Sequence, residues 1–427
     1  MPPVDPHKQR VFAVDVVRQL REHTFEAYWA GGCVRDQLLG NMPKDYDVAT
    51  TARPEDVRAV FGRRRTVAVG ESFGVVCVVG PYASGQVEVA TFRQDAAYSD
   101  GRHPDSVQFS TPQADAERRD FTINGMFFDP LEDRVIDFVG GQDDLVRQVI
   151  RAIGDPQARF AEDKLRLLRA ARFAAALDFT IDPPTRDALE AMAPQVTVVS
   201  IERIAAEMRL MLVHSSRVRA VHLLHETGLL TALLPELNVI DQNESLTATG
   251  RSADDAWVTT LEMLSVLAEP SFPLAFAVLL HAFVDGGGAE VICRRWKLSN
   301  RETERTRWLV AQQNVLVDAE HAPWPKLQRI LTSAGIDELL ALHEAEAAAK
   351  SKGTSHIEHC RRRLSLPADE LNPPPLITGD DLVRHGVPRG KEYQRLLEAV
   401  RDAQLEKQIT TQQEALKLVD KLRSAGP

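Results

Sequence analysis

The pattern of apolar and polar residues divides the start of the chain into short strands. Residues 27–30 are largely apolar, and 74–80 form an apolar run bounded by glycines, as is typical of buried strands. Apolar and polar positions alternate in 86–92, which predicts a strand with valines toward a core. Glu88 lies between those valines in sequence, so it is expected on the opposite, open face.

Helical periodicity takes over in other segments and dominates after the first third of the chain. Residues 54–61 and 201–212 read as helices, and 160–177 is rich in Ala, Leu and Arg without an interior Gly or Pro. Residues 8–22 predict an amphipathic helix whose apolar positions recur every third residue. The residues assigned to that buried stripe are Val11, Val14, Val17 and Leu20.

A glycine pair follows the first strand and opens the next helix. Gly31 and Gly32 allow a sharp turn and a close approach to a ligand, because neither has a Cβ. The free N–H groups of a helix start are suited to phosphate, and Arg35 in the first turn adds a positive charge. This segment is therefore a candidate phosphate site.

Two carboxylates follow that helix at one-residue spacing. Asp45 and Asp47 begin a second strand, and strand alternation places both on one face and Tyr46 on the other. A pair of carboxylates beside a phosphate-binding turn is what Mg²⁺ ions on a nucleoside triphosphate require. Either half of this arrangement alone is common, but the short spacing between them favours a catalytic site.

A charged segment, 115–124, has two interpretations. Arg118, Arg119 and Asp120 in succession exclude a core strand, and the segment could simply be a charged helix start. Alternatively, the two guanidinium groups hold triphosphate or ribose oxygens, while Asp120 and Asn124 reach a ribose hydroxyl.

The helix predicted over 160–177 carries charges at three-residue intervals on an otherwise apolar surface. At about 100° per residue, Asp163, Arg166 and Arg169 share an arc of roughly 120°, while Arg172 lies nearly opposite Asp163. Arg172 is therefore expected to contact phosphate or to hold a neighbouring residue. Surface ion pairs are the simpler alternative, but charges amid apolar surface need partners.

An aspartate beside an arginine can select bases. Cytosine and adenine each present a ring-nitrogen acceptor next to an amino donor, which an Arg donor and an Asp acceptor both satisfy. Uracil and guanine present the reverse pattern on the same edge. Asp163 with Arg166 would therefore accept C and A and reject U and G.

Four stretches together resemble the bacterial class II family of CCA-adding enzymes and poly(A) polymerases within the nucleotidyltransferase superfamily. They are GGCVRDQLLGNMPKDYDVAT, ERRDFTINGM, DFVGGQDDL and RFAEDKLRLLRAARF, and they cover about the first half of the chain. The resemblance implies that Glu88 completes a carboxylate site for Mg²⁺ with Asp45 and Asp47. It also selects the nucleotide-binding interpretation of 115–124 and gives Asp163 and Arg166 the role of a protein template, with Glu162 supporting them. The nucleotide-binding residues expected are Gly32, Arg35, Arg118, Arg119, Asp120, Asn124, Asp163, Arg166, Arg169 and Arg172.

The polar segment 93–107 predicts a loop. In the resembled family a loop here takes part in the switch from C to A addition, and it looks full length in this chain.

Composition limits the alternatives further. The chain has 427 residues and a net charge of −10, so an RNA partner would have to be bound by local arginine clusters. Two arginine triplets, 63–65 and 361–363, are more simply explained as solvated surface. The four cysteines have no metal or disulfide spacing, and neither a membrane span nor a signal peptide is evident, so a cytoplasmic protein is expected.

The predicted fold class is α+β, with a nucleotidyltransferase-type mixed α/β head followed by an all-α neck, body and tail. The domains expected are a catalytic head over 1–148, a neck over 149–260, a body over 261–365 and a tRNA-binding tail over 366–427. The predicted function is addition of C, C and A to tRNA 3′ ends from CTP and ATP, with neither DNA nor a membrane as partner. A poly(A) polymerase and a tRNA enzyme that adds only A or only CC remain alternatives.

Overall fold

The computed structural model forms two compact units, Met1–Asn238 and Val239–Pro427. It describes residues 4–70, 74–95, 107–241, 246–247, 250, 252–390 and 392–424. The predicted loop 93–107 therefore lies mostly outside the described residues, since only its two ends are placed. Within the described part of the chain, no helix is both long and apolar enough to cross a membrane.

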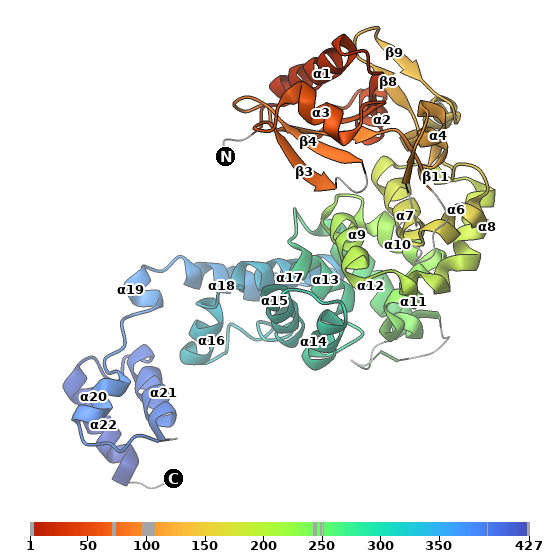
Figure 1. Cartoon of the computed structure of the whole chain (residues 1–427). Helices are drawn as coiled ribbons and strands as arrows, with labels where there is room; N and C mark the ends of the chain where they lie inside the picture. Colours follow the sequence, from red (N-terminus) through yellow and green to blue (C-terminus); the bar gives the residue numbers. More distant parts are fainter. Residues whose placement is uncertain are drawn as a thin grey trace. The chain divides into compact units, whose positions relative to one another are not determined.

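The first unit starts as a mixed α/β structure and continues as helices (Figure 1). Its strands are β1 (Ala27–Ala30), β2 (Asp47–Thr50), β3 (Thr66–Gly70), β4 (Val75–Val79), β5 (Gln86–Thr91), β6 (Arg93–Asp95), β7 (Val107–Phe109), β8 (Phe127–Asp129), β9 (Arg134–Ile136), β10 (Val149–Ile150) and β11 (Thr180–Ile181). Its helices are α1 (Pro6–Glu22), α2 (Gly32–Leu38), α3 (Pro54–Phe61), α4 (Pro112–Glu117), α5 (Gly141–Arg147), α6 (Pro156–Glu162), α7 (Leu165–Leu177), α8 (Pro183–Met192), α9 (Ile201–Val213), α10 (Arg217–Glu226) and α11 (Leu229–Leu233).

A seven-stranded sheet in the order β3-β4-β5-β2-β1-β8-β9 is the framework of the head. β2 and β5 run parallel and the other neighbouring pairs run antiparallel. The β2–β5 register pairs Asp47 with Glu88, so two predicted carboxylates occupy adjacent positions on neighbouring strands. The alternation expected for β5 is confirmed, because its valines are buried while Glu88 is exposed.

Aromatic packing fixes which way β2 faces. Tyr46 is buried and its ring centroid lies 4.7 Å from that of Trp29 on β1. Trp29 in turn donates its indole N–H to the Ala13 carbonyl of α1 at 3.2 Å. Because this side of the strand is locked into the core, Asp45 and Asp47 are left on the exposed side. The predicted alternation of exposed and buried side chains over 45–47 is confirmed, but the predicted start of the strand is wrong, because β2 begins at Asp47 and Asp45 and Tyr46 precede it.

The apolar face predicted for α1 is partly wrong. Val17 and Leu20 are buried, but Val11 is 67% exposed and Val14 is only half-buried. The positions that face the sheet are Gln9, Phe12, Ala13, Val16, Val17 and Leu20. A three-residue step falls about 60° short of a full turn, so a run at that spacing drifts around the helix and cannot stay on one face.

The single helix predicted over 160–177 is also interrupted. α6 ends at Glu162, Asp163 is extended with φ −146° and ψ 104°, and α7 begins at Leu165. Asp163 therefore does not share a helical arc with Arg166, and the angular argument made from one continuous helix is wrong. The neck also contains a two-stranded parallel ribbon, β10–β11, where only helices were predicted.

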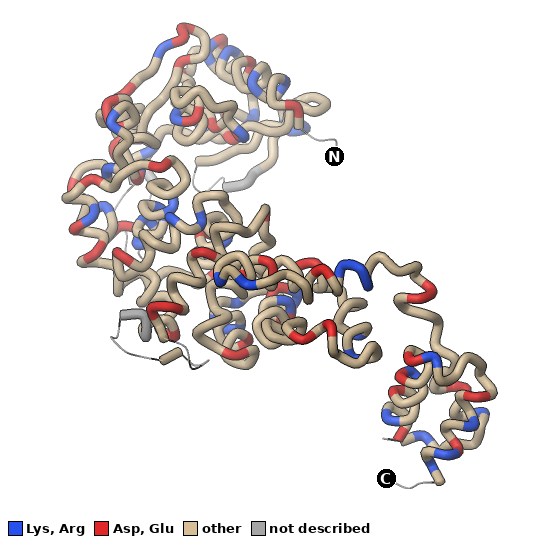
Figure 2. The backbone as a smooth tube through the Cα atoms, turned by 180° about the vertical axis from the view of Figure 1, so that it is seen from behind, with Lys and Arg blue, Asp and Glu red and all other residues tan. Residues whose placement is uncertain are grey.

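The described residues of the second unit have helices as their regular secondary structure. These are α12 (Ala253–Val266), α13 (Phe272–Leu280), α14 (Gly286–Arg295), α15 (Asn300–Ala311), α16 (Trp324–Leu331), α17 (Ile336–Ala349), α18 (Ser355–Leu364), α19 (Ala368–Leu371), α20 (Gly379–Arg384), α21 (Glu392–Leu405) and α22 (Gln412–Ser424). Acidic and basic residues are interspersed along this unit and along the first one (Figure 2). The α+β class is confirmed, whereas the four domain boundaries stay a prediction.

The buried carboxylate of Asp129 should be a main stabilising contact of the head. It accepts from Arg21 at 2.5 Å and from the backbone N–H of Leu131 and Glu132. Asp129→Ala would leave these donors without their acceptor, which should cost about 3 kcal/mol or more. Thermal unfolding measures this cost, with the exposed Asp143→Ala as control. Equal losses in both variants would contradict the assignment.

Candidate active site

A pocket of about 460 Å³ lies within the first unit and collects most of the predicted site residues. Those lining it are Gly32, Arg35, Asp47, Arg118, Arg119, Asp120, Asn124, Asp163, Arg166 and Arg169. Asp45, Glu88 and Arg172 are not among its lining residues. The lining holds six arginines against three aspartates, a charge balance suited to a polyphosphate.

The glycine turn lines the pocket, and a side chain at its first residue, Gly31, would be strained. Gly31 has φ +73°, a conformation that L side chains rarely adopt. A Cβ built on Gly31 would lie 2.9 Å from Nη1 of Arg119. α2 begins at Gly32 and brings Arg35 to the pocket in its first turn. The turn therefore lets a guanidinium group and the backbone share one side of the pocket.

The carboxylate of Asp47 is destabilised in its ionised form. Loss of hydration against neighbouring protein atoms and repulsion from Glu88 raise the pKa of Asp47 to about 6. Asp45 adds further repulsion, and Arg119 partly offsets it. A bound cation would stabilise the ionised form of Asp47, because a positive charge offsets both the repulsion from Glu88 and the loss of hydration.

These carboxylates suit a metal ion that takes most of its ligands from water and substrate and only a few from protein. Among the side chains that the structure describes, no three His, Cys, Asp or Glu converge into a ready-made metal cluster. Mg²⁺ commonly binds through one or two carboxylates together with water and substrate phosphate. Asp47 and Glu88, which the β2–β5 register pairs, fit that mode, since carboxylate oxygens are hard ligands, and Asp45 lies two residues before Asp47.

One buried carboxylate holds both arginines of the predicted RRD triplet. Asp115 contacts Arg118 at 2.7 Å through one oxygen and Arg119 at 2.9 Å through the other. Burial would raise the pKa of Asp115, but the two guanidinium groups hold it below its usual value. The arginines are thus fixed before a ligand arrives. Asp115 was not singled out from the sequence, although its spacing of three and four residues from the arginines signals the contact.

The next carboxylate ties the head to α7. Asp120 is buried and accepts from Arg169 at 2.8 Å and from the amide of Asn124 at 3.1 Å. Burial alone would raise the pKa of Asp120, but Arg169 and these hydrogen bonds lower it. Asn124 accepts in turn from Arg35 at 2.8 Å. Three predicted nucleotide-binding residues therefore form one connected network with Arg169.

Asp163 is paired with a residue that the sequence did not indicate. Arg203 of α9 donates to its two oxygens at 3.1 and 2.6 Å, in a bidentate pair. Arg166 instead donates to Glu162 at 2.5 Å and to the backbone carbonyls of Arg159 and Arg118. The predicted supporting contact of Glu162 is therefore present, while Asp163 and Arg166 each have a different partner.

Two further residues, Glu207 and Phe173, contact arginines of the site. Glu207 of α9 binds Arg172 at 2.5 Å, so Arg172 holds a neighbour, which is one of the two roles expected for it. Phe173 lies beneath the guanidinium groups of Arg35, Arg169 and Arg172, at 5.1, 5.1 and 4.1 Å from the ring centroid. Arg203 and Glu207 lie four residues apart on one helix, but their partners are distant in sequence and no local pattern identifies them.

Comparisons with known proteins bear on this arrangement. The Poly A polymerase head domain family matches residues 27–151. Further family profiles, for an RNA-binding segment of polymerase A and for a second domain of tRNA nucleotidyltransferases, match 178–240 and 273–419.

Individual relatives extend this likeness over the chain. The CCA-adding enzyme of Geobacillus stearothermophilus is 34% identical over 95% of both chains. A crystal structure of the Bacillus stearothermophilus CCA-adding enzyme in complex with CTP matches with a TM-score of 0.75 and 30% identity, covering 97% of each chain. Poly(A) polymerase I of Haemophilus influenzae is 36% identical over 53% of this chain and 52% of its own.

The raised pKa of Asp47 gives a test of its environment. Folding penalises the ionised form, so stability should fall as pH rises from about 4, where the unfolded carboxyl ionises, through about 6. In EDTA, Asp47→Asn should therefore raise the melting temperature at pH 8, on the order of 2–4 °C, and much less at pH 4. Thermal unfolding at both pH values measures the gain. The matched control is Asp143→Asn on α5; a gain in Asp47→Asn that does not depend on pH would contradict this explanation.

Proposed function

The chain belongs to the bacterial family of CCA-adding enzymes and poly(A) polymerases, and we propose that it adds C, C and A to the 3′ end of tRNA from CTP and ATP, releasing pyrophosphate. The likeness to a CCA-adding enzyme over 95% of both chains carries the proposal. The pocket is consistent with it, because Asp47 and six arginines line one cavity.

The head supplies the groups for nucleotidyl transfer. The polymerase head family implies a divalent metal, and we propose Mg²⁺, held by Asp45 and Asp47 with Glu88. When bound, the metal neutralises phosphate charge and favours ionisation of the tRNA 3′-hydroxyl. The carboxylates also attract that hydroxyl's proton while the oxygen attacks the α-phosphate in line and pyrophosphate leaves.

Arginines held in advance bind the triphosphate. Asp115 keeps Arg118 and Arg119 in place in the lining of the pocket, where guanidinium groups can bind phosphate or ribose oxygens. The turn at Gly32 and the side chain of Arg35 line the same pocket and add further donors. Since these groups are ordered beforehand, little entropy is lost when the nucleotide binds.

Base selection falls to Asp163 and Arg166. A carboxylate has about four lone-pair sites, so Asp163 can accept from an exocyclic amino group while it keeps Arg203. Arg166 still has an Nε–H, for which the structure gives no acceptor among the described residues. An amino donor beside a ring-nitrogen acceptor, present in C and A, matches this pair. Arg203 is then a positioning residue, which orients the carboxylate.

A poly(A) polymerase is the second candidate, because Poly(A) polymerase I of Haemophilus influenzae shares 36% identity over 53% of this chain. That likeness covers about half of each protein, whereas the CCA-adding relative spans nearly all of both. Addition of only A or only CC is a narrower form of the first proposal.

Since CTP, ATP and tRNA are the substrates in the first proposal, we place the reaction in the cytoplasm.

The deciding assay uses purified protein, Mg²⁺ and tRNA that ends at the discriminator base, at C or at CC. With CTP and ATP together, we expect extension to CCA and then termination. Long A tails on unrelated RNA would instead identify a poly(A) polymerase. Extension that stops at CC, or that occurs only on tRNA ending in CC, would identify a partial enzyme.

Asp163→Ala should impair base choice more than transfer. Without its acceptor the pocket no longer rejects the uracil edge, so the preference for CTP over UTP should fall about tenfold or more. Arg203→Gln should lower the same preference to a smaller degree, because the carboxylate remains but is less well oriented. Single-nucleotide incorporation with CTP and with UTP measures both, and Asp143→Ala is the control. An unchanged preference in Asp163→Ala would contradict the assignment.

A further inference from the structure

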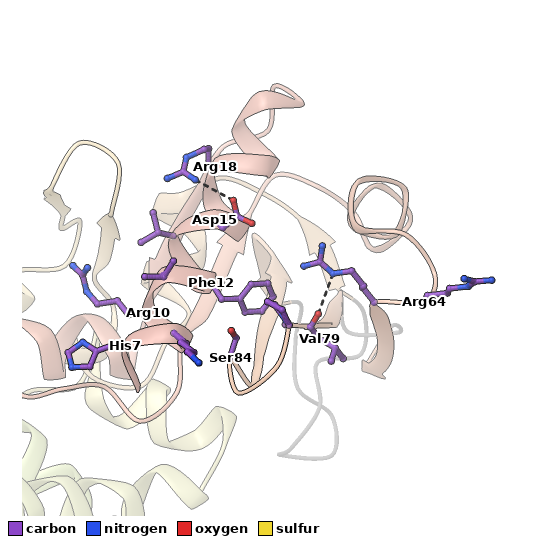
Figure 3. Close-up of a pocket in the computed structure, with 14 residues that line it drawn as sticks. His7, Arg10, Phe12, Asp15, Arg18, Arg64, Val79 and Ser84 are labelled. Atoms are coloured by element: carbon purple, nitrogen blue, oxygen red, sulfur yellow. Dashed lines mark hydrogen bonds and ion pairs between the residues drawn. The ribbon is translucent and has the colours of Figure 1, made fainter. Parts of the chain in front are cut away.

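A second cavity of about 1010 Å³ lies in the first unit, between α1, the residues before β3 and the segment after β4 (Figure 3). We call it the α1 groove. It shares none of its lining residues with the active-site pocket. It includes two features of the sequence that the proposed reaction does not use: the valines of α1 that face away from the core, and part of the 63–65 arginine triplet.

The floor of the groove is apolar and firmly packed. Val11 is 67% exposed and Val79 is 39% exposed, so each leaves apolar surface in contact with water. Phe12 is buried and points from α1 toward the segment that follows Val79 (Figure 3). A Cβ on Gly80 would lie 2.8 Å from the Phe12 ring, so the two surfaces are in close contact there. The groove therefore has a preformed apolar base.

The rim is basic in a chain that is acidic overall. Asp15 is the one acid among the lining residues, in a chain of net charge −10. It is hydrogen-bonded to Gln19 at 2.6 Å and lies 3.3 Å from Arg18. The cationic lining residues are Lys8, Arg10, Arg18, Arg64 and Arg65, with His7 beside them. This excess of positive charge around exposed valine is complementary to a ligand that is both acidic and apolar.

These features favour a protein partner over RNA. Proteins bind single-stranded RNA by stacking bases on accessible aromatic rings, but Phe12 is 4% exposed, which leaves the imidazole of His7 as the one exposed aromatic ring among the described lining residues. Apolar side chains can instead cover Val11, Val14 and Val79. Lys8, Val11 and Arg18 fall on one outward stripe of α1 at helical spacing, a surface along which another helix can lie.

We propose that the α1 groove docks an acidic amphipathic helix of a partner protein. Leucine-like side chains of that helix cover Val11 and Val79, and its carboxylates meet Lys8 and Arg64 on the two sides of the groove. The site lies apart from the active-site pocket, so docking leaves nucleotide addition intact. It would allow the enzyme to be held near another protein while it works.

A synthetic probe tests the proposal directly. A fluorescein-labelled helical peptide with leucine on one face and glutamate on the other is titrated with the full chain by fluorescence anisotropy. Matched probes are a scrambled peptide of the same composition, a peptide with lysine in place of glutamate, and a single-stranded RNA. We expect the acidic amphipathic peptide to bind at least about tenfold more tightly than either other peptide, and more weakly as salt rises.

Variants place the binding on the groove. Val11→Asp and the pair Lys8→Glu with Arg64→Glu should each weaken peptide binding about tenfold or more. Val146→Asp on α5 and Arg134→Glu on β9 are matched exposed controls and should not weaken it. All of these variants should retain tRNA extension. Hydrogen exchange should show new protection in α1 and in residues 79–84 when the peptide is present.

Three outcomes would overturn the proposal: equal binding of the scrambled peptide, peptide binding that the groove variants leave unchanged, and preferential binding of RNA at Lys8 and Arg64. Loss of tRNA extension in the control variants would instead indicate a folding defect. Retained folding is therefore verified by thermal unfolding before each titration.

Discussion

The arrangement of this site depends on one electrostatic constraint: a guanidinium group taken out of bulk water needs a carboxylate or carbonyl partner. Asp115 meets two arginines, Glu162 meets Arg166, and Asp163 meets Arg203. These pairs order the charged side chains before a nucleotide binds, so that binding itself does not have to order them. Because arginine has five donors and a carboxylate accepts several bonds, each pair retains capacity for a ligand.

Asp47 and Glu88, the carboxylates on the sheet, lack among the described residues the close partners of opposite charge that the arginines have. Nothing in the described structure pairs Asp47 with a cation as closely as Asp115 is paired, and the parallel register places Glu88 beside it. The same pocket therefore contains arginines whose charge is compensated and a carboxylate, Asp47, that has no such close partner in the described part of the chain. The first group favours order before binding, while the second favours capture of a positive ion, and nucleotidyl transfer requires both.

The sequence predicted the features that depend on residues close together in the chain. The alternation at Glu88 and the burial pattern over 45–47 were predicted correctly, because the two sides of an extended segment differ in burial, although β2 itself begins only at Asp47. It did not predict the break at Asp163, since residues on both sides are good helix formers and the extended backbone is held by tertiary contacts, among them Arg203. The buried face of α1 was misassigned because a three-residue repeat does not follow one helix face. Phe173 looked like ordinary core; only the fold shows three guanidinium groups around it.

The ring of Phe173 has a consequence for a site that must take a pyrimidine and then a purine. Each guanidinium group over this ring also has a carboxylate partner: Asp36 for Arg35, Asp120 for Arg169 and Glu207 for Arg172. Ion pairs have steep angular preferences, and the aromatic face adds a second contact from another direction. A wall held in this way keeps its shape, so both kinds of base have to be accepted through the hydrogen-bonding edge that they share and not by reshaping this wall.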